Sequence, residues 1–361
     1  MTSTSASAIS PLDAEDLRAR VQKTVDDLLS AQEPLLESIS HDLAPLSEAL
    51  RDLLSGGKRL RPAFAYWGWR AIGGADCNEA IIAASALEFL QACALIHDDV
   101  MDGSDTRRGK PAAHRRFATL HRGSSWLGSP DNFGVGAAIL LGDLCLSWAD
   151  EMLFTCGLDS VALARGKAVY DVMRTELMAG QYLDLLEQAV GGGSVDRALT
   201  VVRYKSAKYT IERPLHLGAA LAGGGPDVMV ALTDYGLPLG EAFQLRDDVL
   251  GVFGDPSQTG KPAGDDLREG KRTVLVAEAL ERSNPTQAAV VRRHLGDPAL
   301  TPEGVAELRE VITDTGAIDR VESMIAELTE RAFAALSSPL LNPVAIPVLE
   351  GLAIAATSRA V

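Results

Sequence analysis

The sequence predicts an all-α fold, and three observations support this prediction. Apolar residues recur at helical spacing along most of the 361 residues. Ala and Leu are prominent among them, while aromatic residues make up only 5% of the chain, which favours helix packing over sheets. Alternating, strand-like stretches are nearly absent. We expect a disordered N-terminus over residues 1–11 and a single large helical bundle domain of ten or more helices over residues 12–361.

The first part of the chain predicts helices separated by proline and glycine. Residues 1–11 are mostly small and polar and end in Pro11, so we expect no regular structure there. The elements that follow are a helical segment over 12–54 interrupted near Pro34 and Pro45, a glycine break at 55–57, a helix with Pro62 in its first turn that ends at the glycines 73–74, a long apolar helix over 79–101, and a loop with short helical pieces over 103–134.

The rest of the chain predicts a series of helices with glycine-rich breaks at 191–193 and 223–226. The predicted helices span 135–154, 160–190, 195–222, 227–253, 270–283, 286–295, 302–313, 316–337 and 343–359.

The acidic composition disfavours two classes of partner. The chain holds 34 basic and 49 acidic residues, a net charge of −15. Nucleic-acid binding depends on neutralising phosphates with Lys and Arg, so we expect no nucleic-acid partner. Docking on an anionic membrane is disfavoured for the same reason. An anionic substrate would therefore have to meet a local basic cluster or metal ions.

The sequence also predicts a cellular compartment. No stretch reaches the ~18 uninterrupted apolar residues that a membrane span needs, and the N-terminus lacks the basic and apolar regions of a signal peptide. The cysteines form no Cys-x-x-Cys pair and sit mostly in apolar surroundings; they are Cys77, Cys93, Cys145 and Cys156. These features predict a soluble cytoplasmic protein with reduced thiols and no stable membrane insertion.

Three aspartates stand at the end of the predicted helix over 79–101. Asp98 and Asp102 are four residues apart and project from one helix face, with Asp99 turned about 100° away. Two carboxylates this close need a cation or a proton between them. Oxygen ligands at this spacing suit Mg²⁺, which bridges to substrate phosphates. A solvated acidic helix end is the alternative, but the apolar residues 89–96 disfavour it because they place the pair at the end of a buried helix.

A second acidic pair, Asp247 and Asp248, lies on the apolar stretch 237–253. Two such pairs could face each other across a cavity. Basic residues follow or precede both pairs: Lys58, Arg59, Arg61, Arg107, Arg108, Lys205, Lys208, Lys261, Lys271 and Arg272. Each alone is typical of a surface charge, but aspartates and cations around one site suggest a metal-bridged diphosphate. A nucleotide P-loop is excluded, because the full glycine spacing is absent around Lys261.

Six motifs, in order, resemble those of the trans-isoprenyl diphosphate synthases, also called polyprenyl synthetases. They are residues 56–62 (Gly-Gly-Lys-Arg-Leu-Arg-Pro), 95–102 (Leu-Ile-His-Asp-Asp-Val-Met-Asp) with 105–111 (Asp-Thr-Arg-Arg-Gly-Lys-Pro), 180–184 (Gly-Gln-Tyr-Leu-Asp), 205–206 (Lys-Ser), 243–248 (Phe-Gln-Leu-Arg-Asp-Asp) and 259–262 (Thr-Gly-Lys-Pro). The resemblance is strong over residues 50–280. It implies a helical isoprenoid synthase bundle around a central cavity, a magnesium cofactor and a homodimer, most like a geranylgeranyl diphosphate synthase.

The resemblance also implies a role for each matching residue. The metal ligands would be Asp98, Asp102 and Asp247, supported by Asp99 and Asp248, with Asp266 a weaker candidate. The allylic diphosphate would be contacted by Arg107, Lys205 and Lys261, and isopentenyl diphosphate by Lys58, Arg61, Gln91 and Arg108. Ser206 and Gln244 would shield the carbocation with their dipoles. The implied reaction is ionisation, condensation and proton loss, with the released diphosphate as the base.

Three features depart from the family pattern. Gly251 stands where the second motif usually has a third aspartate, so metal binding there would depend on Asp247 and Asp248. Gln91 stands where many members have a histidine, which predicts weaker but not absent isopentenyl diphosphate binding. Segment 117–134 is longer than the family norm, and the sequence suggests no function for it.

Product length is predicted from residues that precede the first motif. In this family the product tail grows down a tunnel beside that helix. Cys93 and Ala94 are small where a bulky aromatic would close the tunnel, and Leu90 could restrict it one turn further back. We therefore expect a twenty-carbon product, geranylgeranyl diphosphate, and expect Cys93→Phe to shorten it. The alternative is that these are ordinary core residues and another helix sets the limit.

Four other functions remain open from the sequence. A shorter-chain (farnesyl) or a longer-chain polyprenyl diphosphate synthase would use the same motifs. A terpene cyclase also has an aspartate-rich helix, but its usual second motif is absent at residues 247–248 and the basic cluster at Lys58 and Arg61 would be superfluous. A non-catalytic partner subunit would fit Gly251 and Gln91, but not the intact first motif.

Overall fold

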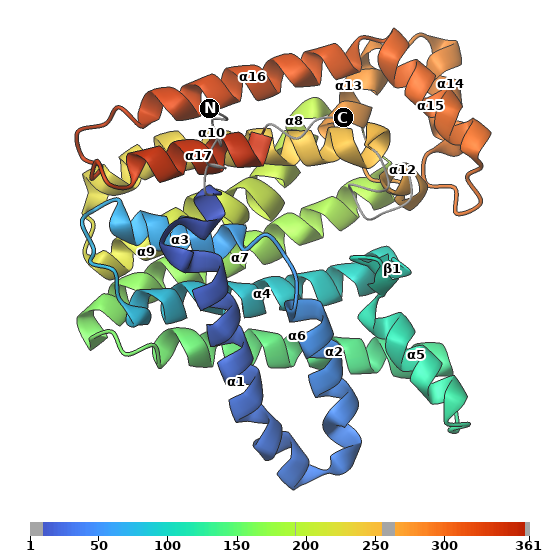
Figure 1. Ribbon diagram of the computed structural model, residues 1–361. Helices are drawn as coiled ribbons and strands as arrows, with labels where there is room; N and C mark the ends of the chain where they lie inside the picture. The colour runs from blue at the N-terminus through green and yellow to red at the C-terminus, as the bar shows by residue number, and fades with distance from the viewer. Residues whose placement is uncertain (1–9, 192, 255–263, 358–361) are drawn as a thin grey trace, which may run out of the picture.

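The computed structural model describes residues 10–191, 193–254 and 264–357, and its fold is all-α as predicted (Figure 1). Within those ranges the strands are β1 (Thr106–Arg107) and β2 (Lys110–Pro111), which pair antiparallel in one short hairpin. The expected disordered segment lies mostly outside the described residues. At its end, Ser10 caps a 3-10 helix that already begins at Pro11.

The described helices up to the middle of the chain are η1 (Pro11–Asp16), α1 (Leu17–Ile39), η2 (His41–Leu43), α2 (Ala44–Leu54), α3 (Leu60–Arg70), α4 (Asn78–Asp102), α5 (Ala113–Gly123), α6 (Pro130–Phe154) and α7 (Ser160–Val190). Those that follow are α8 (Val195–Val201), the π-helix η3 (Val202–Glu212), α9 (Arg213–Ala222), α10 (Pro226–Phe253), α12 (Asp265–Glu269), α13 (Val274–Arg282), α14 (Pro285–His294), α15 (Pro302–Asp314), α16 (Ala317–Ala335) and α17 (Ile346–Thr357).

Long helices stack side by side and build the molecule in layers. Figure 1 shows α16 along one side, α10 and α17 next to it, and α4 and α6 toward the opposite side. Helix α4 packs against α6, and α10 packs against both η3 and α16. The hairpin of α1 and α2 crosses this stack and projects beyond it (Figure 1). Helices α4 and α10, which carry the two aspartate pairs, thus both border the interior of the molecule.

Two groups of buried apolar side chains form the core, and α10 contributes to both. Leu239 and Phe243 of this helix belong to the group that contains α1, α3, α4 and α6. Leu245 and Val249 belong to the group that contains α13, α15 and α16. Helix α10 therefore fixes the position of its aspartates relative to both halves of the chain.

Two helices are long and apolar enough to span a membrane by length and composition alone. They are α4 and α6, and 72% of the apolar window of α4 is buried in the structure, against 39% for α6. Burial explains the composition of α4, since it lies in the core. The outer face of α6 needs another explanation.

Some element boundaries differ from the prediction. Helix α1 runs through Pro34, because Val25, Leu29 and Leu36 continue one buried face on both sides of the proline. The expected loop over 103–134 contains α5 and the first turn of α6. The expected helix over 195–222 is wound as a π-helix at 202–212.

Candidate active site

A central cavity of about 740 Å³ brings most of the predicted site residues together. Of the predicted residues, its walls contain Lys58, Arg61, Gln91, Ala94, Asp98, Arg107, Lys205, Ser206, Gln244, Asp247, Asp248 and Asp266. They come from segments far apart in the sequence, namely the loop before α3 and its first turn, the second half of α4, β1, the π-helix η3, the second half of α10, and α12. Lys261 lies outside the described residues. Asp98 of the first pair therefore shares one cavity with Asp247 and Asp248, while Asp102 is outside its lining.

At the end of α4, Asp98 is surrounded by cations. Lys205 Nζ lies 3.2 Å from Asp98 and 2.6 Å from Asp184, and Arg107 Nη2 lies 3.5 Å from Asp98. Burial opposes ionisation of Asp98, but Lys205, Lys271 and Arg107 hold the pKa of this carboxyl below its ordinary value. Asp98 is therefore a charged oxygen donor at neutral pH.

Asp99 points away from the cavity. Its carboxylate is buried and accepts a hydrogen bond of 2.9 Å from Nε of Arg107. The supporting role expected for Asp99 thus takes the form of holding Arg107, whose guanidinium lies on the cavity wall.

Asp102 shows that the site is suited to a metal ion. Its side chain is 2% exposed, and within the described part of the chain neither carboxylate oxygen accepts a hydrogen bond. Lys271 Nζ, at 3.5 Å, is a nearby positive charge. Burial, and then the charge of Asp98, raise the pKa of Asp102 to about 6. A buried carboxylate with unused oxygens and a like charge one turn away fits a divalent cation.

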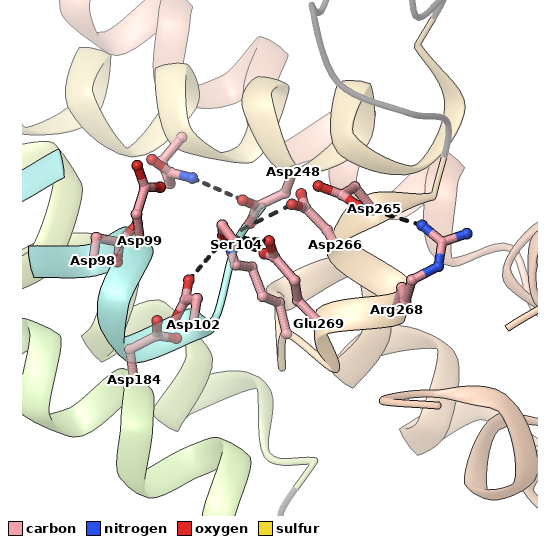
Figure 2. Close-up of polar contacts among 12 residues, drawn as sticks. Asp98, Asp99, Asp102, Ser104, Asp184, Asp248, Asp265, Asp266, Arg268 and Glu269 are labelled. Carbon is pink, nitrogen blue, oxygen red and sulfur yellow. Dashed lines mark hydrogen bonds and ion pairs between the residues drawn. The ribbon is translucent and has the colours of Figure 1, made fainter. Parts of the chain in front are cut away.

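The second aspartate pair faces the same space from α10. Asp248 is 6% exposed and accepts a hydrogen bond of 2.8 Å from Nε2 of Gln244. Figure 2 shows Asp248 and Asp266 pointing toward the space that Asp102 borders. Among the described residues no three acidic, His or Cys side chains form a preassembled metal site. A bridging anion between α4 and α10 would therefore have to complete the coordination of a metal.

Cations line the opposite part of the cavity. Arg61 donates a hydrogen bond of 2.8 Å from Nη2 to Thr210 Oγ1, and its guanidinium lies 4.4 Å from the centre of the Tyr209 ring. These two contacts hold Arg61 against the π-helix η3, so its remaining donors face the cavity with Lys58. An anionic ligand is the chemical complement of this wall.

Comparison with known proteins identifies the family. The polyprenyl synthetase family model matches residues 44–313, which is most of the chain. The chain belongs to the polyprenyl synthetase family.

Relatives of known structure and sequence agree with this assignment. A geranylgeranyl pyrophosphate synthase from Corynebacterium glutamicum, crystallised with isoprenyl diphosphate and magnesium, superposes with a TM-score of 0.92 at 45% identity, covering 95% of this chain and 99% of that one. Geranylgeranyl diphosphate synthase of Mycobacterium tuberculosis is 32% identical over 289 residues, 80% of this chain and 77% of that protein. Geranylfarnesyl diphosphate synthase of Aeropyrum pernix is 33% identical over 296 residues, 80% of this chain and 86% of that protein. The predicted fold, prenyltransferase class and magnesium cofactor are confirmed.

Among the predicted catalytic and binding residues that the structure describes in this polyprenyl synthetase, Asp99, Asp102 and Arg108 are outside the lining of the central cavity. Arg108 donates hydrogen bonds of 2.7 and 2.6 Å to the backbone carbonyls of Leu53 and Gly56, beside a second cavity of about 400 Å³. Its guanidinium therefore holds the glycine loop before Lys58.

Of the three predicted chain-length residues, one lines the central cavity and two lie in the core. Ala94 lies on the cavity wall. Leu90 and Cys93 are 1% and 5% exposed and belong to the core between α4 and its neighbours, with Cys93 Sγ 3.7 Å from Nδ1 of His97. Of the three, Ala94 is thus the residue with direct access to the cavity.

Two further residues of the site, Asp184 and Lys271, had no individual role in the prediction from the sequence. Asp184 of α7 pairs with Lys205, although its motif at 180–184 was recognised. Lys271 follows α12, lies in the cavity wall, and pairs with Glu269 at 2.9 Å and Asp102 at 3.5 Å. Pairing across such long sequence separations leaves no local pattern, so only the motif and the basic cluster could have indicated these residues.

Proposed function

We propose that this polyprenyl synthetase is a geranylgeranyl diphosphate synthase, which condenses isopentenyl diphosphate with allylic diphosphates in a magnesium-dependent reaction. The observation that carries the proposal is the central cavity, where Asp98 of α4 shares the walls with Asp247 and Asp248 of α10 and with Lys and Arg side chains. The similarity to geranylgeranyl pyrophosphate synthases at 45% and 40% identity supports the twenty-carbon product.

The aspartate side of the cavity is proposed to bind the allylic diphosphate. Asp98, Asp102 and Asp247 would hold magnesium, with Asp248 in support, while Arg107, Lys205 and Lys261 would contact the diphosphate oxygens. Bound magnesium supplies the positive charge that makes diphosphate a better leaving group. Lys205 can contact the diphosphate as a cation, because it stays protonated in the buried site. Burial opposes protonation, but Asp98 and Asp184 raise the pKa of Lys205 above its ordinary value.

The basic side of the cavity is proposed to bind isopentenyl diphosphate. Lys58 and Arg61 would bind the diphosphate directly, Gln91 would add a hydrogen bond, and Arg108 would fix the loop that carries Lys58. Gln91 lines the cavity, and its Nε2–H groups are the donors from which a diphosphate oxygen would accept.

The two proposed diphosphate sites share one cavity, which allows head-to-tail condensation. The allylic C1–O bond breaks and diphosphate leaves, the double bond of isopentenyl diphosphate attacks the allylic C1, and a proton is lost to the released diphosphate. Ser206 and Gln244 line the cavity between the two sides and would orient their dipoles toward the carbocation. No step requires a protein base.

Assembly and location are proposed from less direct support. We infer a single isoprenoid synthase domain over residues 12–361, because α10 joins the two groups of core residues. We infer a homodimer, because the outer face of α6 exposes Phe133, Ile139 and Leu140. A cytoplasmic location remains our proposal from the sequence.

Product analysis tests the proposed function. Purified protein is incubated with Mg²⁺, isopentenyl diphosphate and each allylic primer in turn, and the products are dephosphorylated and measured by chromatography and mass spectrometry. A dominant twenty-carbon product is expected. A shorter or longer product would overturn the product assignment, a hydrocarbon from geranylgeranyl diphosphate alone would indicate a cyclase, and no product with any primer would indicate a partner subunit.

A further inference from the structure

A buried ion pair lies behind the glycine loop that carries Lys58. Arg59, the next residue, is 4% exposed, and its Nη1 donates a hydrogen bond to the carboxylate of Glu88 on α4, which is 5% exposed. Neither residue is in the lining of the central cavity, whereas Lys58 and Gln91, their close neighbours in the sequence, both line it. The pair is therefore adjacent to the cavity without contacting what the cavity holds.

The guanidinium of Arg59 joins three segments of the fold. Besides Glu88 of α4, it donates from Nη2 to Gln22 Oε1 of α1 and to the carbonyl of Leu54, the last residue of α2. The last carbonyls of a helix have no partner within the helix, so Arg59 supplies a donor and a positive charge where α2 ends. A guanidinium can reach these three acceptors at once because its donors form a planar fork.

The backbone at Arg59 has a conformation that arginine rarely adopts. Its φ is 57° and its ψ is 33°, in the left-handed region that favours glycine. Such a conformation persists only where the surrounding contacts fix it, and here these contacts are the hydrogen bonds of the guanidinium. The chain turns at this residue, and Lys58 before it and Arg61 after it both line the central cavity.

Glu88 also offsets the positive charge behind the loop. Arg108 donates hydrogen bonds of 2.7 and 2.6 Å to the carbonyls of Leu53 and Gly56, so a second guanidinium holds the same loop. Burial lowers the pKa of Arg108, the charge of Glu88 acts against this change, and the charge of Arg59 adds to it. Without the carboxylate of Glu88, the two guanidinium groups would repel each other and the loop between them would shift.

We propose that Arg59 and Glu88 are positioning residues that hold the loop of Lys58 in the shape that binds isopentenyl diphosphate. The inference rests on the proposed function, because it takes Lys58 and Arg61 as the residues that bind this diphosphate. A loop that is fixed before the ligand arrives loses less conformational freedom on binding, so the affinity is higher. The effect is specific to isopentenyl diphosphate, because the allylic diphosphate binds at the aspartate side of the cavity.

The test measures binding of isopentenyl diphosphate alone, which cannot condense without an allylic partner, by calorimetric titration into the full-length protein. Glu88→Gln keeps the shape of the side chain and removes its charge. We expect the dissociation constant to rise about 10-fold, the effect of losing one charge-assisted hydrogen bond. In steady-state assays the KM for isopentenyl diphosphate should rise by a similar factor, while kcat and the KM for the allylic primer stay unchanged.

Three further variants separate positioning from stability. Arg59→Lys keeps the charge, but one ammonium cannot reach all three acceptors, so it should weaken binding as Glu88→Gln does. The double variant Arg59→Met with Glu88→Leu leaves neither charge of the pair buried alone, so it should remain folded and still bind weakly. Glu241→Gln on α10 breaks another ion pair of a buried carboxylate, with Arg203 Nε at 2.8 Å, and should bind isopentenyl diphosphate as the wild type does.

Two results would overturn the proposal. One is wild-type affinity for isopentenyl diphosphate in Glu88→Gln and in the double variant, together with lower unfolding temperatures, which would show that the pair only stabilises the fold. The other is a KM for the allylic primer that rises as much as the KM for isopentenyl diphosphate, which would show a general disturbance of the cavity. The wild-type titration tests the proposed function separately, because a wild-type protein that does not bind isopentenyl diphosphate would overturn that function itself.

Discussion

Asp248 is the carboxylate whose charge the fold opposes strongly. Burial raises its pKa from 3.8 to about 8; the hydrogen bond from Gln244 acts against this rise, and the charges of Asp266 and Asp247 add to it. The native protein without metal therefore keeps a proton on Asp248 over a pH range in which the unfolded chain has lost it. That stabilising contribution is fully present below about pH 4 and is lost as pH rises through about 8.

Asp248→Asn should remove this pH dependence, since asparagine stays neutral. In chelator, the variant should gain stability relative to the wild type as pH rises from about 5 to about 9, because only the wild type must ionise a buried group. Thermal unfolding of both proteins across this range measures the difference. Asp102 titrates in both proteins, so its contribution largely cancels. A difference in unfolding temperature that does not vary with pH would contradict the elevated pKa.

Variants at Ala94 and Cys93 distinguish an effect on product length from an effect on core packing. Ala94 lines the cavity, so Ala94→Phe is expected to block tail growth and shift the product to fifteen carbons or fewer with the fold retained. Cys93 is 5% exposed in the core, so Cys93→Phe should in addition cost about 1–3 kcal/mol through overpacking. Product chromatography and denaturant unfolding of both variants distinguish the two effects. Unchanged products in both variants would place the tunnel elsewhere.

At the scale of elements, glycines let the helices that line the cavity approach each other. A Cβ at Gly180 of α7 would lie 2.4 Å from the backbone nitrogen of Lys205 and 2.7 Å from the carbonyl carbon of Tyr204. This close approach allows Asp184, one turn further along α7, to reach Lys205 on the π-helix η3 at 2.6 Å. The motif at 180–184 thus combines a packing residue with a charged one.

Gly180→Ala should separate α7 from η3, because the obstructing atoms belong to the backbone and cannot rotate away. We expect a loss of about 1–3 kcal/mol of stability and a lower kcat, since the pairing of Lys205 with Asp184 is disturbed. Gly123→Ala at the end of α5 meets nothing within 4 Å and is the control, expected to be neutral or to gain up to about 1 kcal/mol. Denaturant titration and steady-state kinetics test both. Equal stability of the two variants would show that α7 can shift without consequence.

Helical periodicity predicted most elements but not their local windings. The helix predicted over 160–190 is observed over Ser160–Val190, because Asp159 caps its start and Gly191 ends it. The π-helix at Val202–Glu212 has the same composition as an α-helix and is set by packing against α7 and α10, so no local pattern indicates it. Helix α5 was predicted only as a short helical piece within a loop, because its buried face contains His114 and His121, which periodicity counts as polar.

The sequence motifs predicted which residues gather at the candidate site. They did not predict the directions in which the side chains point. Asp98, Lys205 and Asp247 line one cavity, as expected from six ordered motifs. The neighbouring Arg107 and Arg108 have the same residue type, yet Arg107 lines the cavity while Arg108, with a φ of 54°, turns to the glycine loop. The different directions of Arg107 and Arg108 depend on the β1–β2 hairpin. No motif in the sequence predicts the geometry of that hairpin.

At the scale of the whole molecule, α6 presents an apolar outer surface. Its inner face packs on α4 and α5, whereas Phe133, Ile139 and Leu140 are 39%, 44% and 63% exposed. The helix is apolar enough to span a membrane, although only 39% of its apolar window is buried in the single chain. A surface of this kind is typical of an interface between subunits, and an isologous pairing would cover it in both copies at once.

Leu140→Asp should convert the proposed dimer to a monomer. The substitution places a charge on the α6 surface, where burial against a second copy would remove it from water at a cost of several kcal/mol. Because Leu140 points outward in the single chain, the fold itself should be retained. Light scattering coupled to size-exclusion chromatography gives the mass of each species, with 38.2 kDa expected for the monomer. Val230→Asp, on α10 and 60% exposed, is the matched control and should remain dimeric. A wild-type protein that elutes as a monomer, or a Leu140→Asp variant that remains a dimer, would show that another surface or no second copy covers α6.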